Sequence, residues 1–302
     1  AASAIGVVCG LIGTMFHFGV HEVTAFRGTH PWVLYLLPLA GFVIVSFYKL
    51  TETDGLGTDD IIDAVHEGKL LPAIFFGTVL THLCGGSAGR EGAALQMGGT
   101  IGQCMGRTFR LDDRDLRVAT LAGMAAFFSA LFGTPLAATV FAIMVISIGV
   151  IYHVALYPSL LAALVAYGVS VRLGVEPTRF TVAVPDQSVG MFVRVAALGV
   201  LCALVSILFC KLMHGAGHLM KRIKNPWLRV ICGGFAVIAL TWIFGTDYNG
   251  AGMDVVTRAI EQETVAVPWA FLLKLVFTAV TLAAGFKGGE VVPSFFVGAT
   301  FG

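Results

Sequence analysis

Long apolar runs, each about the length needed to cross a bilayer, alternate with short polar stretches along the chain. A spanning helix needs about 20 mostly apolar residues. The runs that meet this requirement cover roughly 1–20, 32–50, 117–150, 151–172, 190–212, 228–245 and 268–286. No segment has the period-two alternation of a strand, so the pattern predicts an all-α, multi-pass membrane protein.

Three further apolar runs, 70–84, 92–106 and 291–302, are too short or too rich in glycine to cross a bilayer alone. The chain contains 37 glycines and 10 prolines. Broken helices of this kind are typical of transporters, in which irregular backbone lines the substrate site. We therefore expect broken or re-entrant helices within a single transmembrane transporter domain over 1–302.

Polar breaks fall at 51–69, 107–117, 173–189 and 211–229. The last of these breaks contains no acidic residue, and its basic residues are Lys211, Lys221, Arg222, Lys224 and Arg229. Because basic loops are enriched on the cytoplasmic side of membranes, we expect this break in the cytoplasm.

Composition supports a membrane location and argues against a nucleic-acid partner. Apolar residues make up 57% of the chain, charged residues 12%, and the mean hydropathy is +0.87. The 19 basic residues are balanced by 18 acidic ones, so no strong field is available to recruit nucleic acid. The six cysteines lack C-x-x-C spacing, and no metal site, cofactor or signal peptide is predicted.

Three short motifs recur in the same order. The G-x-G-x-D segment at 55–59 recurs at 250–254 (250 − 55 = 195), G-R-E at 89–91 recurs as G-G-E at 288–290 (290 − 91 = 199), and G-G-T-I-G at 98–102 recurs as G-A-T-F-G at 298–302 (298 − 98 = 200). The ordered set predicts two homologous halves, about 32–172 and about 190–302. Parallel and inverted halves both fit the motifs.

Glu91 is the strongest candidate functional residue. It follows the glycine-rich segment 85–89, and a new helical run continues directly from it at Gly92. The amides at such a helix start bind anions through their N–H groups and through the helix dipole. An ionised Glu91 would itself occupy this position, and a protonated Glu91 would leave it, so Glu91 is predicted to be both gate and proton carrier. The alternative is that Glu91 only caps its helix and pairs with Arg90.

Glu290 repeats the arrangement after a second glycine-rich segment. Its protonated carboxyl would donate a hydrogen bond to a bound anion. In the alternative interpretation, Lys287 merely neutralises the charge of Glu290. The residues predicted to surround the anion are Leu56, Gly57, Arg90, Gly92, Glu290 and Val291.

Several other polar residues have simpler explanations. His17, His21 and Glu22 share a helical face, but two histidines without a third partner do not make a metal site, so interfacial helix polarity is the expected explanation. His214 and His218 are expected to contact solvent or headgroups. Lys274 is expected to lie on a helix face directed to polar protein or to an interface.

These motifs resemble the CLC family of chloride channels and proton-coupled anion exchangers. GLGTD at 55–59 looks like that family's G-S-G-I-P segment, G-R-E-G at 89–92 matches its gating-glutamate motif, and GGEVVPSFFVGATFG at 288–302 resembles its later G-G-x-F-x-P segment. The resemblance implies a homodimer with one pore in each subunit. It also implies a site tyrosine in a C-terminal tail. The first residue is not Met and the last, Gly302, lies inside an apolar run, so we expect a fragment of a longer chain.

Departures from the chloride-type pattern resemble the fluoride-exporting branch of the family. Leu56 replaces a serine, although methionine is typical of the fluoride branch, and Ala93 replaces a proline. Glu290 stands where chloride-type members have an apolar residue, and Met144 and Val145 occupy the places of a proton-relay glutamate. A fluoride/proton antiporter in a bacterial plasma membrane is therefore the favoured prediction.

Two rival functions remain open on the sequence. A chloride exchanger or a passive anion channel would have the same fold, and a channel differs from an antiporter in whether Glu91 and Glu290 must take up a proton in each cycle. A membrane-embedded enzyme would need an intramembrane nucleophile and base, such as G-x-S-x-G, paired aspartates or a metal triad, and we find none. The chain is therefore not predicted to be an enzyme.

Overall fold

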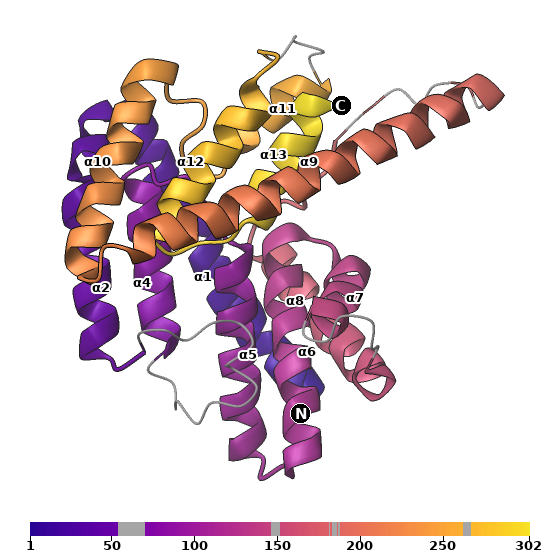
Figure 1. Ribbon diagram of the computed structural model, residues 1–302. Helices are drawn as coiled ribbons and strands as arrows, with labels where there is room; N and C mark the ends of the chain where they lie inside the picture. The colour runs from indigo at the N-terminus through magenta and orange to yellow at the C-terminus, as the bar shows by residue number, and fades with distance from the viewer. Residues whose placement is uncertain (54–69, 146–151, 181, 183–185, 187, 262–266) are drawn as a thin grey trace. The chain divides into compact units, whose positions relative to one another are not determined.

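The computed structural model describes residues 1–302 except for 54–69, 146–151, 181, 183–185, 187 and 262–266 (Figure 1). In chain order its elements are α1 (Ala2–Thr29), η1 (Pro31–Leu36), α2 (Leu37–Leu50), α4 (Leu70–Leu83), α5 (Glu91–Thr108), α6 (Asp113–Phe132), α7 (Pro135–Val145), η2 (His153–Ala155), α8 (Leu156–Arg172), α9 (Val189–Lys221), α10 (Pro226–Phe244), α11 (Met253–Glu261), α12 (Ala270–Ala284) and α13 (Val291–Phe301). The described residues contain no strand, which confirms the all-α prediction.

The described residues contain both long and short apolar helices, as the sequence predicts. Within the described ranges, six segments are long and apolar enough to cross a membrane, namely Ala2–Thr29, Pro31–Leu50, Asp113–Phe132, His153–Arg172, Val189–Lys221 and Pro226–Phe244. The short apolar helices α4 and α13 coincide with the predicted short runs 70–84 and 291–302. The run predicted at 268–286 forms α12, which has only 15 residues.

The run predicted as one stretch at 117–150 is broken, and this part of the prediction is wrong. Helix α6 ends at Phe132 because Gly133 adopts a left-handed conformation, with φ +69°, and its amide N–H donates to the carbonyl of Ser129. Pro135 then begins α7. Glycine after a helix end and proline at a helix start are the residues that favour such a break.

The predicted polar break at 211–229 is mostly helical. Helix α9 continues through Lys211 and ends at Lys221, and only residues 222–225 separate it from α10. Asn225 caps α10 by accepting hydrogen bonds from the amides of Trp227 and Leu228, at 3.0 and 3.4 Å. The basic residues therefore lie on two helix ends and a short connection.

The chain divides into two compact units that interleave along the sequence. The first comprises Ala1–Thr29, Ser46–Leu80 and Arg90–Thr178, and the second comprises His30–Val45, Thr81–Gly89 and Arg179–Gly302. These units are defined by spatial proximity, so they do not test the repeat boundaries predicted from the motifs.

Helix α6 is the centre of the first unit. Its residues from Val118 to Leu131 are all buried, and α1, α5, α7 and α8 pack around it. Helix α5 approaches it most closely, since a Cβ atom on Gly98 would overlap the carbonyl oxygen of Gly123, and one on Gly102 would overlap that of Ala119. Glycine is required at these positions to let the two backbones meet.

Helix α12 is the centre of the second unit, where it contacts α9, α10 and α13. A Cβ atom on Gly233 of α10 would collide with the side chain of Ala284, so α10 and α12 also meet through a glycine. Helix α11 packs against α13. The glycine-rich segment 248–252 connects α10 to α11, and the segment 285–289 connects α12 to α13.

Candidate functional site

Helix α5 begins at the predicted gating residue. Arg90 is the N-cap residue, with φ −116° and ψ 1°, and Glu91 is the first helical residue. The amide of Ala94 donates to the carbonyl of Arg90 at 3.0 Å, so the amides of Gly92 and Ala93 have no acceptor within the helix. Glu91 has an exposed fraction of 0%. A buried carboxyl group therefore stands at the positive end of a helix dipole.

Helix α13 begins with the same backbone geometry, displaced by one residue from the predicted match. Its N-cap residue is Glu290, with φ −111° and ψ −6°, and the amide of Ser294 donates to the carbonyl of Glu290 at 3.0 Å. Glu290 is thus the local counterpart of Arg90, and Val291 is the counterpart of Glu91. The offset of 199 between the two glutamates is therefore wrong for the helix starts, which differ by 291 − 91 = 200.

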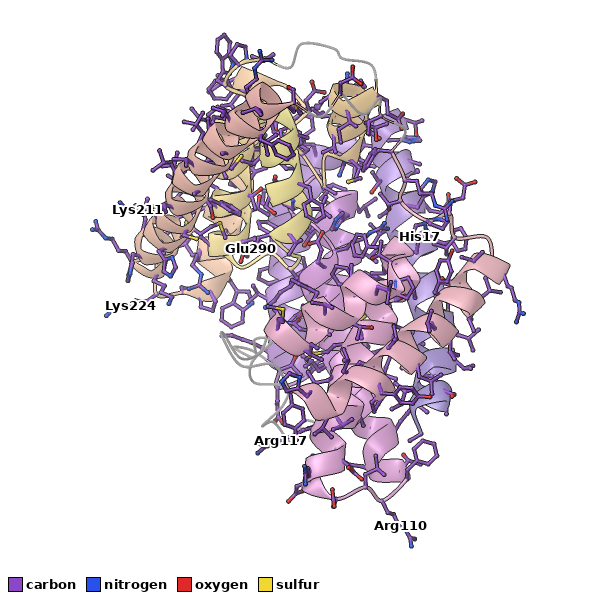
Figure 2. All side chains as sticks on the ribbon, turned by 90° about the vertical axis from the view of Figure 1, so that its right-hand side faces the viewer. His17, Arg110, Arg117, Lys211, Lys224 and Glu290 are labelled. Atoms are coloured by element: carbon purple, nitrogen blue, oxygen red, sulfur yellow. The ribbon has the colours of Figure 1, made fainter. Side chains whose placement is uncertain are left out.

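The two glutamates also differ in exposure. Glu91 is buried, whereas Glu290 is exposed at the start of α13 (Figure 2). Glu91 is the first residue of α5, whereas Glu290 is the N-cap residue of α13. The sequence motif alone made the pair look equivalent.

The glycine-rich segments before the two helices lie side by side in the second unit. Gly89 and Gly289 form an antiparallel bridge, in which each amide donates to the other carbonyl, at 2.7 and 2.8 Å. Gly288 has φ +159°, and a Cβ atom there would overlap Ala88. The bridge pairs residues 200 apart in sequence, which agrees with the helix starts.

Hydroxyl groups of α12 support the first glycine-rich segment. The amide of Ser87 donates to the hydroxyl of Thr281 at 3.1 Å, and the hydroxyls of Ser87 and Thr278 are 3.1 Å apart. The amide of Lys287 donates to the hydroxyl of Thr81 at 3.2 Å. The hydroxyl-bearing residues are all buried, and their hydrogen bonds hold the glycine-rich segments in place.

Lys274 is buried beneath a third glycine-rich segment, 248–252. Its exposed fraction is 0%, and its ammonium donates to the carbonyls of Tyr248 and Gly250 at 3.1 and 2.7 Å. The ammonium also lies 5.3 Å from the ring centre of Phe296, a cation–π distance. The prediction that Lys274 faces polar protein is confirmed, but its complete burial was not foreseen.

A sequence signal for this arrangement was available. Lys274, Thr278 and Thr281 are spaced i, i+4 and i+7 in an otherwise apolar helix, and this spacing places them on one face. A polar face on such a helix indicates contact with polar protein rather than with lipid.

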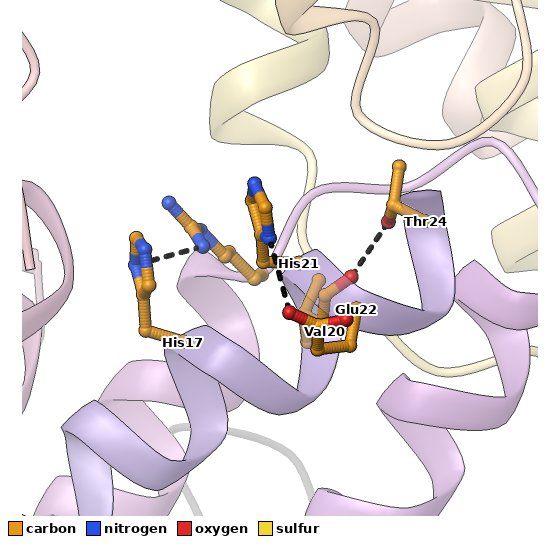
Figure 3. Close-up of polar contacts among 6 residues, drawn as sticks. His17, Val20, His21, Glu22 and Thr24 are labelled. Atoms are coloured by element: carbon orange, nitrogen blue, oxygen red, sulfur yellow. Dashed lines mark hydrogen bonds and ion pairs between the residues drawn. The ribbon is translucent and has the colours of Figure 1, made fainter. Parts of the chain in front are cut away.

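Arg90 is held by residues of the first unit. Its Nη1 lies 3.2 Å from His17 Nδ1 (Figure 3), and its guanidinium lies 5.4 Å from the ring centre of Phe132. Since arginine has only donors, the Nδ1 atom of His17 must accept this bond. His17 therefore positions the residue next to Glu91, a contact that was not predicted from the sequence.

The histidine neighbours of Arg90 do not form a metal site. His17 and His21 stack with ring centres 6.4 Å apart, and His21 lies 3.9 Å from the carboxylate of Glu22. His21 and Glu22 are largely exposed, as expected for interfacial residues. No group of three or more metal-ligating side chains occurs among the residues that the structure describes.

The predicted site is therefore only partly observed. Leu56 and Gly57 lie outside the described residues. Arg90, Glu91 and Gly92 lie together at the start of α5, and Glu290 and Val291 lie together at the start of α13.

Known proteins resemble the chain over all or most of its length. Residues 40–302 match the family model described as "Voltage gated chloride channel". A chloride/fluoride channel protein of Pseudomonas syringae pv. tomato is 36% identical over 100% of this chain and 70% of its own length. An H(+)/Cl(-) exchange transporter of Cronobacter sakazakii, ClcA, is 26% identical over 100% of this chain and 71% of its own length. The crystal structure of a CLC-type fluoride/proton antiporter has a TM-score of 0.92 and 33% identity, covering 100% of this chain and 78% of that one.

Proposed function

Because the chain belongs to the CLC family of voltage-gated chloride channels and their relatives, we propose that it is a fluoride/proton antiporter that exports fluoride and is gated by Glu91. Members of this family are membrane transporters and channels for small anions, and the chain is accordingly an integral membrane protein. Its bacterial relatives indicate the plasma membrane as its location.

One observation carries the proposal. Glu91 is a fully buried carboxyl group at the start of α5, in a chain that resembles a fluoride/proton antiporter over its entire length. A buried carboxylate is costly unless donors or charges compensate it. The amides of the helix start and the neighbouring Arg90 are such donors, and a small anion competes for the same groups.

The exchange cycle follows from this competition. Ionised Glu91 occupies the helix-start amides and excludes the anion. When Glu91 takes up a proton, its carboxyl loses its attraction to the helix dipole, and the anion takes its place. Because Glu91 must take up a proton before the anion binds, the movements of protons and fluoride are coupled through Glu91, and the proposal assigns them opposite directions.

Glu290 is the proposed selectivity residue. Fluoride is small and strongly hydrated, so it gives up water only where close donors replace it. A protonated carboxyl at Glu290 supplies a strong O–H donor, whereas an ionised one repels the anion. The amides of Gly57, Gly92 and Val291 are the proposed backbone donors. Leu56 removes the hydroxyl that chloride-type relatives carry in the corresponding segment.

The proposed assembly is a homodimer in the lipid bilayer, with one pore in each subunit. The transported ions are fluoride and protons, and the proposal requires no cofactor. Chloride/proton exchange is the second candidate, favoured by the 26% identity to an H(+)/Cl(-) exchange transporter over the full chain.

Liposome flux separates the two candidates. Purified protein is reconstituted into vesicles loaded with fluoride or with chloride, and anion release is followed with an ion-selective electrode while a dye reports internal pH. The proposal expects fluoride release much faster than chloride release, with protons moving in the opposite direction. Equal release of both anions would refute the fluoride assignment. Fluoride release without proton movement would refute antiport.

A further inference from the structure

Helix α9 is too long to lie wholly within a bilayer. It contains 33 residues, which corresponds to about 50 Å at 1.5 Å per residue. The hydrocarbon core is about 30 Å thick, and even at a tilt of about 40° the helix extends further than this along the membrane normal. Residues 189–210 carry a single charged residue, Arg194. The remaining part, 211–221, therefore extends into the headgroup layer.

The part of α9 that extends beyond the hydrocarbon is amphipathic. At 100° per residue, one arc of about 100° contains most of its cationic and titratable residues. The members of this arc, all exposed, are Lys211, His214, His218 and Lys221, together with the C-cap residue Arg222, whose helical backbone continues the arc by one residue. The other side of the helix carries Leu212, Met213, Leu219 and Met220. We call the arc, together with Lys224 of the following connection, the basic stripe.

The basic stripe has no acidic neighbours in sequence. No Asp or Glu occurs between residues 187 and 246. Figure 2 shows Lys211 and Lys224 projecting outward from the same end of α9. The chain offers a contrasting segment at 107–117, in which three aspartates accompany Arg107, Arg110, Arg114 and Arg117. Of these two segments, the basic stripe is the one whose cationic residues have no acidic neighbours in sequence.

We propose that the basic stripe binds the phosphate groups of anionic phospholipids. Lysine and arginine bind phosphate through charge-assisted hydrogen bonds, and clusters of them next to a spanning helix attract anionic headgroups. A zwitterionic lipid carries its own cation beside the phosphate, so the basic stripe discriminates against it. Trp227, in the first turn of α10, lies where aromatic residues anchor helices at the headgroup level. This lipid site is independent of which anion the protein transports.

Trp227 also provides the probe. In a protein in which Trp32, Trp242 and Trp269 are replaced by Phe, the fluorescence of Trp227 is measured in vesicles containing brominated phosphatidylglycerol or brominated phosphatidylcholine. Bromine quenches tryptophan on contact, so the quenching gives the relative affinity of each lipid for the surface near Trp227. We expect a preference of about fivefold for phosphatidylglycerol, the factor expected from one cation near an anionic surface.

The variants are matched in charge. Replacing Lys211, Lys221, Arg222 and Lys224 by Gln is expected to abolish the preference, whereas replacing Arg107, Arg110, Arg114 and Arg117 by Gln is expected to leave it unchanged. Equal quenching by the two lipids in the starting protein, or a preference that survives the first set of substitutions, would overturn the proposal. Loss of the preference on adding millimolar inorganic phosphate would overturn it in favour of a soluble ligand.

A second measurement needs no variant and therefore tests the proposal even if the substituted proteins do not fold. Native mass spectrometry of the unmodified protein, released from nanodiscs of equal phosphatidylglycerol and phosphatidylcholine content, is expected to retain phosphatidylglycerol selectively. Retention of both lipids in equal amounts would also overturn the proposal.

Discussion

The ammonium of Lys274 lies 2.7 Å from the carbonyl oxygen of Gly250, and the amide of Gly250 lies 3.2 Å from the carbonyl oxygen of Gly86. Gly86 is five residues before Glu91 in sequence, in the segment that leads into α5. One buried cation therefore organises a series of backbone hydrogen bonds that joins two glycine-rich segments far apart in sequence.

Replacing Lys274 by Met is expected to destabilise the protein by about 3 kcal/mol. Methionine has a similar length but no donor, so it leaves the buried carbonyls of Tyr248 and Gly250 without this partner. Unfolding by SDS in mixed micelles gives the free energy. Replacing the exposed Lys49 by Met is the control and is expected to change stability by no more than about 0.5 kcal/mol. Equal stabilities for the two variants would contradict this role of Lys274.

Replacing Glu91 by Gln is expected to abolish proton-coupled fluoride exchange. The amide keeps the shape and burial of the side chain, but it cannot take up and release a proton near neutral pH. The liposome assay with the electrode and the pH dye measures both fluxes. Glu22→Gln removes a carboxylate that is 78% exposed and is expected to leave exchange intact. Full coupled exchange in the Glu91 variant would show that Glu91 acts only as a helix cap.

Replacing Glu290 by Ala is expected to reduce the preference for fluoride over chloride by about tenfold or more. A hydrogen bond to a charged partner contributes about 1.5–3 kcal/mol, and each 1.4 kcal/mol corresponds to a factor of ten. The ratio of initial release rates from fluoride-loaded and chloride-loaded vesicles is the measurement. Glu290→Gln retains an N–H donor and is expected to keep part of the preference. An unchanged ratio in the alanine variant would remove Glu290 from the site.

Replacing Gly98 by Ala is expected to destabilise the protein by about 1–3 kcal/mol, since the added methyl overlaps the carbonyl oxygen of Gly123. Gly168 in α8 is the matched control, because nothing lies within 4 Å of a Cβ atom there. Alanine at Gly168 is expected to be neutral or to stabilise the helix by up to about 1 kcal/mol. Thermal unfolding in detergent compares the two variants, and similar midpoints would contradict the close approach of α5 and α6.

The sequence predicted the helices better than it predicted their ends. Apolar length was sufficient to identify the long spans and the short helices α4 and α13. It did not separate α6 from α7, although Gly133 and Pro135 carry the local signal for a break. The end of α9 was also missed, because a basic surface on a helix that leaves the membrane resembles a polar loop in a simple count of charges.

The candidate site was predicted in its chemistry but not in its register. The motifs identified Glu91 and Glu290, yet matching the glutamates hid the one-residue shift between the two helix starts. The contacts of Lys274 and of His17 could not be predicted, since their partners are backbone carbonyls and an arginine distant in sequence. Spacing within one helix reports a shared face, but it does not identify what that face meets.

The glycine contacts between α5 and α6 constrain how the proposed gate at Glu91 can move. Where two backbones touch at Gly98 and Gly102, no side chain lies between them that could repack to allow sliding. Tilting α5 would separate these surfaces and expose buried backbone over its length. Opening and closing should therefore be confined to the side-chain torsions of Glu91, and the helix that carries it should show the slow amide exchange of a rigid element throughout the transport cycle.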